Sequence, residues 1–111
     1  MEGYILRGEF AEKLEIDVEI ARQCVSERIK FSEGKSHLCL FNMKGIKSVT
    51  KEARDSLGKE GVELIKAGAL LINSPLTKML GNIFLTLNKP KVPTKLFTDE
   101  EEAKEWLRQY L

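Results

Sequence analysis

The sequence has few of the residue types that mark several common classes of protein. Only two cysteines and one histidine occur in 111 residues, so neither a disulfide framework nor a four-ligand zinc site is expected. No run of about 18 apolar residues is present, and no transmembrane helix is predicted. The first residues, from Met1 to Tyr4, carry an acid where a signal peptide carries basic residues. We therefore expect a cytoplasmic protein with reduced thiols and without a cofactor.

A large net charge is also lacking. The 18 lysines and arginines are balanced by 17 aspartates and glutamates, which leaves a net charge of +1. Such a balance gives no long-range field that would attract nucleic acid or an anionic membrane. The glycine-rich motifs that bind nucleotide phosphates are absent as well. Nucleic acid is therefore not an expected partner, and any basic site has to be local.

What the sequence does contain is a regular alternation of two apolar patterns. Short apolar runs typical of strands alternate with segments whose apolar residues recur every three or four positions, as in amphipathic helices. The expected strands are residues 4–10, 37–43, 69–72 and 94–97. The expected helices begin at caps at Asp17, Thr50, Ser74 and Thr98; the second extends to Ile65, and the fourth starts with a capping box of Thr98 and Glu101. This order predicts one α/β domain over residues 1–111, with a mostly parallel sheet of four to five strands and about four helices.

Groups that could carry catalysis are sparse. The single histidine, His37, lies in a predicted buried strand, and no nucleophile with an adjacent base can be named. His37 and Cys39 share a strand face, but no second pair of ligands completes a metal site. The carboxylates of residues 99–102 fit the start of a helix, where they complement its dipole. We therefore expect a non-enzymatic protein without catalytic residues or a bound metal.

One local basic cluster follows the second predicted strand. Lysines surround Ser48 and Thr50 where the chain passes into a helix start, and free backbone amides there can hold a phosphate. Functional groups in open α/β sheets gather beyond the carboxyl ends of strands. The alternative is a solvated loop in which Thr50 only caps the helix. The candidates for binding a partner or an anion are Lys44, Lys47, Ser48, Thr50, Lys51 and Arg54.

The predicted third helix has an unusually wide apolar face between Leu76 and Leu87. Such a face could line a groove for an apolar ligand or contact a partner. The alternative is that it packs on the sheet as part of the core, as amphipathic helices normally do. The candidates for contact with an apolar ligand are Met79, Leu80, Ile83 and Phe84.

Several segments resemble a known group of small bacterial proteins. They are residues 40–54 (LFNMKGIKSVTKEAR), 67–72 (AGALLI), 81–82 (GN), 88–90 (NKP) and 97–107 (FTDEEEAKEWL). These segments resemble small uncharacterised bacterial proteins that are similar to the STAS fold of anti-sigma-factor antagonists, with related families described as STAS/Sec14-like. The resemblance implies a STAS-like (SpoIIAA-like) α/β fold. Folds of this kind host unrelated functions.

The resemblance also implies two alternative functions. Regulatory STAS domains carry a phosphorylated serine in an Asp-Ser pair at a helix start. The matching positions here look like Val49 and Thr50, so the acid is missing. Phosphorylation of Thr50 or Ser48 is therefore a hypothesis. The first alternative is a non-enzymatic regulatory or interaction module that meets an unknown protein partner, or another copy of itself as a homodimer, through residues 44–54. The second, implied by the Sec14-like similarity, is a carrier or sensor of a small apolar or lipid ligand.

Overall fold

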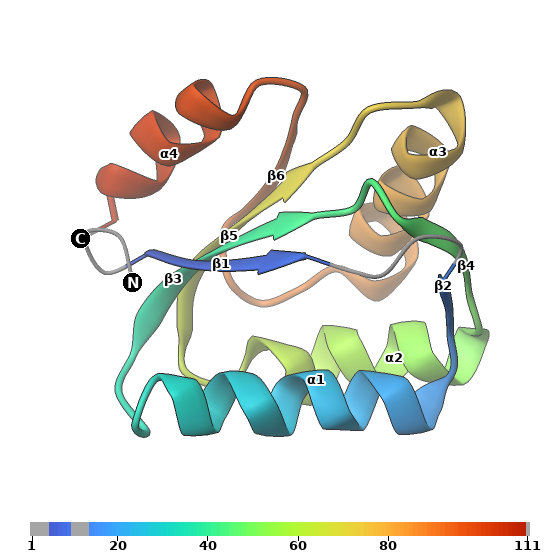
Figure 1. Ribbon diagram of the computed structural model, residues 1–111, viewed down its shortest axis with the longest axis horizontal. Coiled ribbons are helices and arrows are strands. Elements are labelled where there is room, and N and C mark those ends of the chain that lie inside the picture. The colour runs from blue at the N-terminus through green and yellow to red at the C-terminus, as the bar shows by residue number, and fades with distance from the viewer. Residues whose placement is uncertain (1–4, 10–13, 111) are drawn as a thin grey trace.

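A parallel sheet of four strands forms the centre of the computed structural model, which describes residues 5–9 and 14–110 (Figure 1). The strands follow the order β1, β3, β5 and β6, with the bounds Ile5–Glu9, His37–Asn42, Ile65–Leu71 and Thr94–Phe97. A second parallel pair joins β2, Leu14–Ile16, to β4, Ile46–Val49. The predicted α/β architecture with a mostly parallel sheet is confirmed.

Helices cover both faces of the main sheet. In the described part of the chain they are α1, Val18–Phe31; α2, Lys51–Lys59; α3, Pro75–Ile83; and α4, Glu100–Arg108. Figure 1 shows α1 and α2 side by side on one face and α4 on the other. A 3₁₀ turn, Glu60–Val62, follows α2, and a π-helical turn, Phe84–Asn88, follows α3. The crossovers of a parallel sheet thus place α1 and α2 on a face different from that of α4.

Three of the helix starts agree with the caps predicted from the sequence. Asp17 Oδ1 accepts a hydrogen bond from the backbone amide of Ile20 at 2.9 Å, and Thr50 Oγ1 accepts one from Ala53 at 3.1 Å. Ser74 caps α3 as one partner of a capping box. Each side chain satisfies an amide that the first helical turn leaves free.

The cap predicted for the fourth helix is wrong by one residue. The N-cap is Asp99, whose Oδ1 accepts hydrogen bonds from the amides of Glu101 at 2.8 Å and Glu102 at 3.4 Å. Thr98 therefore does not form the expected capping box with Glu101. The physical reason is that a carboxylate is a stronger acceptor than a hydroxyl group, and its charge is favourable at a helix N-terminus.

The second predicted helix is too long. α2 ends at Lys59, and Ile65 begins strand β5 instead of closing a helix. Gly58 and Gly61 lower the helix propensity at this point, while Ile65 is only 8% exposed in its strand position. The predicted strand 69–72 consequently begins earlier, at Ile65, and ends one residue earlier, at Leu71.

Two further differences concern the beginning of the chain and the segment after β3. Residues 46–49, expected to be part of a loop, form β4 because they find a partner in β2, which the periodicity did not reveal. In the predicted strand 4–10, residues 4 and 10 lie outside the described part of the chain. Ile5 of β1 is deeply buried, at 3% exposed. β1 is an edge strand of the main sheet and pairs with β3.

The two faces of the main sheet bury different sets of side chains. The set under α4 is Ile5, Leu38, Leu40, Ala67, Ala69, Ala103 and Leu107. The set on the side of α1, α2 and α3 is Ile16, Ala21, Met43, Ile46, Ala53 and Ile72. Successive residues of a strand point to opposite faces; β3 and β5 supply buried residues to the first set, and Met43 and Ile72, which directly follow these strands, belong to the second.

Candidate functional site

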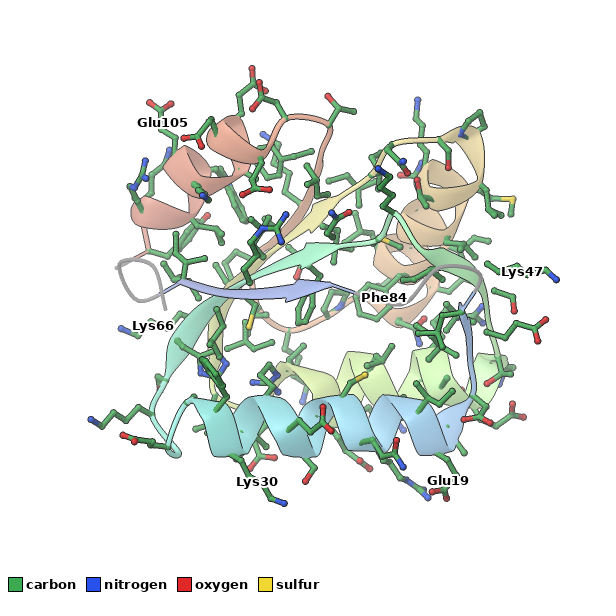
Figure 2. All side chains as sticks on the ribbon, viewed as in Figure 1. Glu19, Lys30, Lys47, Lys66, Phe84 and Glu105 are labelled. Atoms are coloured by element: carbon green, nitrogen blue, oxygen red, sulfur yellow. The ribbon has the colours of Figure 1, made fainter. Side chains whose placement is uncertain are left out.

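An apolar cavity lies between the main sheet and the helices α1, α2 and α3. Its volume is about 230 Å³, larger than the roughly 150 Å³ engineered cavity that binds benzene and smaller than the roughly 300 Å³ at which pockets for drug-sized ligands begin. Leu57, Leu80, Ile83 and Phe84 are among its apolar lining residues. Figure 2 shows Phe84 between the main sheet and the layer of α1 and α2. The cavity is therefore of a size and character suited to a small apolar group.

A lateral row of small residues explains why the sheet leaves space here. Gly68 of β5 pairs in register with Cys39 of β3 on one side and with Thr94 of β6 on the other. The next row on the same face consists of much larger residues, since Leu70 pairs with Phe41. Gly68, Thr94, Phe41 and Leu70 all line the cavity. The hollow lies over the row of small residues, and the large residues of the next row form one of its walls.

Gly68 faces open space in this hollow. A Cβ atom built on Gly68 meets no heavy atom within 4 Å, whereas one built on Gly81 would lie 2.7 Å from Leu96 Cδ2. Gly81 is thus explained by the close approach of α3 to β6, but Gly68 is not explained by crowding. Glycine inside a strand costs roughly 0.5–1 kcal/mol relative to alanine. Glycine nevertheless occupies this position, where any side chain would enter the cavity.

Arg28, near the end of α1, is one of two charged residues among the described residues that line the cavity. Its Nη1 donates hydrogen bonds to the carbonyl of Glu63 at 2.8 Å and to His37 Nε2 at 2.9 Å. Its Nη2 donates to the carbonyl of Gly61 at 3.1 Å. These acceptors are neutral, so Arg28 ties α1 to the segment between α2 and β5 without neutralising its own charge. Burial lowers the pKa of Arg28, while the neighbouring Cys39 and Glu63 oppose that shift.

Arg28 also determines which ring nitrogen of His37 carries the proton. His37 is 3% exposed. A guanidinium group can only donate, so His37 Nε2 accepts and the ring proton lies on Nδ1. His37 Nδ1 donates it to the carbonyl of Lys35 at 2.8 Å. Burial lowers the pKa of His37, the hydrogen bond to Lys35 opposes that shift, and the charge of Arg28 lowers the pKa further. His37 is therefore a neutral, packed side chain.

The two cysteines are reduced thiols in the same half of the molecule. Burial raises the pKa of Cys39 to about 12, against the opposing effect of Arg28. Burial also raises the pKa of Cys24, which lines the cavity, and Glu27 adds to that shift. Both sulfurs are therefore protonated near neutral pH and behave as small apolar groups.

Arg54, in the first turns of α2, is the second charged residue of the lining. Its Nε is buried and has no hydrogen-bond partner in the described part of the chain. No ion pair between Arg54 and a described carboxylate is present. Buried polar atoms are normally hydrogen-bonded, so this unpaired donor distinguishes Arg54 from Arg28.

The structure divides the residues that the sequence singled out into two groups. Leu80, Ile83 and Phe84 line the cavity together with Arg54, so one anion candidate joins three apolar candidates. Met79 does not line the cavity and is 50% exposed. The remaining anion candidates lie apart from the cavity lining.

Those remaining candidates form an exposed surface over β4 and the start of α2. Lys44, Lys47, Ser48, Thr50 and Lys51 are all exposed there. Figure 2 shows Lys47 projecting away from the molecule. Lys47 Nζ lies 4.0 Å from Glu15 Oε1, and Lys51 Nζ lies 3.4 Å from Asp55 Oδ2. Part of the positive charge of this surface is therefore balanced by neighbouring acids.

Sequence reasoning missed Gly68, Cys24 and Arg28 as parts of a site. A signal existed for Gly68, because an isolated glycine within an apolar strand often marks an unusual packing environment. Arg28 was interpreted only as a cation that complements the dipole at the end of α1. Nothing in the spacing of these residues indicates that they face one cavity.

Comparison with known proteins identifies the family of the chain. The sequence matches the family described as Domain of unknown function (DUF7793) over residues 1–111. The chain belongs to this family. No curated protein matches the sequence. This family assignment names no activity, so arguments about function depend on the site itself.

A solved structure shows the same fold. It is an uncharacterised protein of the DUF3478 family with a SpoIIAA-like fold from Shewanella loihica PV-4, with a TM-score of 0.62 and 15% sequence identity. The match covers 93% of this chain and 81% of that chain. The expected SpoIIAA-like fold is thereby confirmed for this member of the DUF7793 family. No helix in the described residues combines the length and the apolar character needed to cross a bilayer.

Proposed function

We propose that this DUF7793 protein is a non-enzymatic carrier or sensor that binds a small apolar or amphiphilic ligand in the cavity. The observation that supports this most is the open space of about 230 Å³ above Gly68. Apolar walls around a space without an occupant cost stability relative to a filled core, because the lining side chains lack packing partners. A bound ligand would recover much of it.

The volume also limits the size of the ligand. A water molecule occupies about 30 Å³ of the liquid, so a cavity of 230 Å³ accommodates on the order of eight non-hydrogen atoms. This fits a small aromatic ring or a medium-length alkyl chain, whereas an entire phospholipid is several times larger. The proposal therefore narrows the lipid alternative to small apolar molecules.

Native mass spectrometry of the purified chain, with and without solvent extraction, tests the proposal. We expect an added mass that extraction removes, or, after loss of a weak ligand, saturable binding of added 1-octanol detected by NMR at the amides of Ile83 and Phe84, which also line the cavity. The variant Gly68→Leu should lose both signals because its side chain fills the cavity. The matched control is Lys66→Leu, which adds the same side chain at an exposed position of the same strand. Absence of any bound or binding small molecule in the wild type would overturn the proposal.

The second candidate function is a regulatory contact with a protein partner, or with another copy of the chain, through the exposed surface of Lys44, Lys47, Ser48, Thr50 and Lys51. The exposure of all five residues supports it. The double variant Lys44→Glu with Lys47→Glu reverses charge there and leaves the cap of α2 intact. If a partner or a dimer uses this surface, its dissociation constant should rise strongly, and an unchanged value would exclude this surface.

A further inference from the structure

The positive charge of the cavity lining indicates which kind of head group the ligand has, and this inference rests on the proposed function. Arg28 and Arg54 bring two positive charges to a lining whose other described residues are apolar or neutral. Among the described residues, no carboxylate forms an ion pair with either arginine. Glu63 acts on Arg28, and Arg54 acts on Asp55, through space without forming an ion pair. An anionic ligand would supply a directly bound negative charge, which neither guanidinium has among the described residues.

The two arginines differ in what they can still bind. Arg28 already donates to the carbonyls of Gly61 and Glu63 and to His37, so its guanidinium is held in place by the protein. Arg54 Nε is buried, and the guanidinium of Arg54 makes no hydrogen bond or ion pair with a described residue. The two terminal Nη groups of an arginine can donate in parallel to two oxygens of a carboxylate or phosphate. Arg54 is therefore the residue positioned to bind an anionic head group directly, and Arg28 adds to the positive potential.

The apolar part of the ligand has a defined place as well. Arg54 and Gly68 line the same cavity, together with Ile83 and Phe84. An alkyl chain or ring that occupies the space above Gly68 would contact these side chains while its polar end reaches the guanidinium. A neutral alcohol could fill the same space, but it would leave the guanidinium of Arg54 without a directly bound anion.

We propose that the ligand is a small anionic amphiphile whose carboxylate or phosphate group is bound by Arg54 and whose apolar part lies over Gly68. The prediction concerns charge and not only size. Ligands with the same alkyl chain and different head groups should therefore bind with different affinities.

Titration of the wild-type chain with octanoate, octyl phosphate, 1-octanol and octylamine tests this, with calorimetry or NMR giving the dissociation constants. We expect an anionic ligand to bind about tenfold more tightly than 1-octanol, as one charge-assisted pair of hydrogen bonds would provide. Octylamine should bind most weakly. Whether octanoate or octyl phosphate binds better distinguishes a carboxylate ligand from a phosphate ligand.

Variants of Arg54 assign the effect to one side chain. Arg54→Met keeps an apolar stem of similar length and should abolish the preference for anions while 1-octanol still binds. Arg54→Lys keeps the charge without the planar fork and should retain part of the preference. The matched control Arg22→Met removes an exposed arginine of α1 outside the lining and should leave the preference unchanged. Thermal unfolding followed by circular dichroism shows that each variant is folded.

The outcomes separate this inference from the proposed function. Equal binding of 1-octanol and octanoate by the wild type, or a preference that persists in Arg54→Met, would overturn the anionic ligand and leave a neutral apolar ligand in the cavity. Failure of all four compounds to bind would overturn the cavity as a binding site, and the anionic ligand with it.

Discussion

The two faces of the main sheet are built from the same strands, yet one is filled and the other is hollow. Under α4, Leu38 and Leu40 of β3 stand beside Ala67 and Ala69 of β5, and all four are 0% exposed. Large residues on one strand are complemented by small residues on the next, and α4 adds Leu107 at 0% exposed. This is the interdigitation of large and small side chains that gives native packing density.

The opposite face lacks this complementarity around Gly68. The row that contains Gly68 also contains Cys39 and Thr94, so small residues lie next to small residues. Ala21 and Cys24 of α1, which also line the cavity, are small as well. The face under α4 is therefore closely packed, whereas the face under α1 and α2 leaves the space that the proposed ligand would fill.

The largest expected difference between the faces follows from truncating one residue on each. Leu107→Ala removes a fully buried side chain and should lower the free energy of unfolding by about 3 kcal/mol. Ile83→Ala removes a half-buried side chain at the cavity and should cost about 1 kcal/mol, because part of its surface has no packing partner to lose. Urea denaturation of both variants without ligand measures the two values. Equal losses would contradict the comparison.

Loss of the Arg28 side chain should have the next largest effect. Arg28→Met removes the donor that the carbonyls of Gly61 and Glu63 and the ring of His37 share. We expect a loss of about 2 kcal/mol in the free energy of unfolding, since acceptors are left unpaired. The control Arg22→Met removes an arginine that is exposed on the same helix, and its free energy of unfolding should change by less than about 0.5 kcal/mol.

Two neighbouring residues of β5 should respond to the same substitution in opposite directions. Ala69→Val adds two methyl groups to the filled face, where Ala69 is 0% exposed, and should cost about 1–2 kcal/mol through overpacking. Gly68→Val adds a side chain where a Cβ meets no heavy atom within 4 Å. It should stabilise the ligand-free protein by about 1 kcal/mol, because valine favours a strand and fills the hollow. Loss of stability in Gly68→Val would mean that the space is smaller than the structure indicates.

The smallest expected effect is a dependence on pH that comes from His37. Burial lowers the pKa of His37 from its ordinary value of 6.5 in the folded state. The folded protein then binds fewer protons than the unfolded chain, so the contribution of His37 to stability is complete above pH 6.5 and is lost as the pH falls below it. Melting temperatures of the wild type and of His37→Gln between pH 5 and 8, roughly the range where histidine titrates, test this. The difference between the two proteins should change on the acid side, and a constant difference would exclude the effect.

Local patterns in the sequence were sufficient for most of the fold. The caps Asp17, Thr50 and Ser74 and the strand segment from His37 were predicted because each depends on neighbours within a few residues. Predictions failed where a distant segment decides the local structure. β4 forms only because β2 lies beside it, and Ile65 belongs to β5 because it is buried next to His37 of β3.

The candidate site was less predictable than the fold. The apolar face of α3 and the basic residue Arg54 were both named from the sequence, but as members of two unrelated sites. Met79 was grouped with Ile83 and Phe84 by helical spacing, yet it is half exposed and lies outside the cavity lining. Helical periodicity tells which residues share a broad face, and it does not tell which part of that face the sheet covers.

The sequence by itself therefore determined the alternation of strands and helices, the parallel α/β architecture and most of the caps, since these depend on hydrogen bonds and apolar contacts among near neighbours. Only the tertiary structure decided that Gly68, Arg28, Arg54 and Phe84 meet around one cavity, although they lie on different elements. A cavity is a place where the side-chain volumes of distant segments fail to fill the space between them. That mismatch depends on how whole helices are seated on the sheet, and no local pattern of residues encodes it.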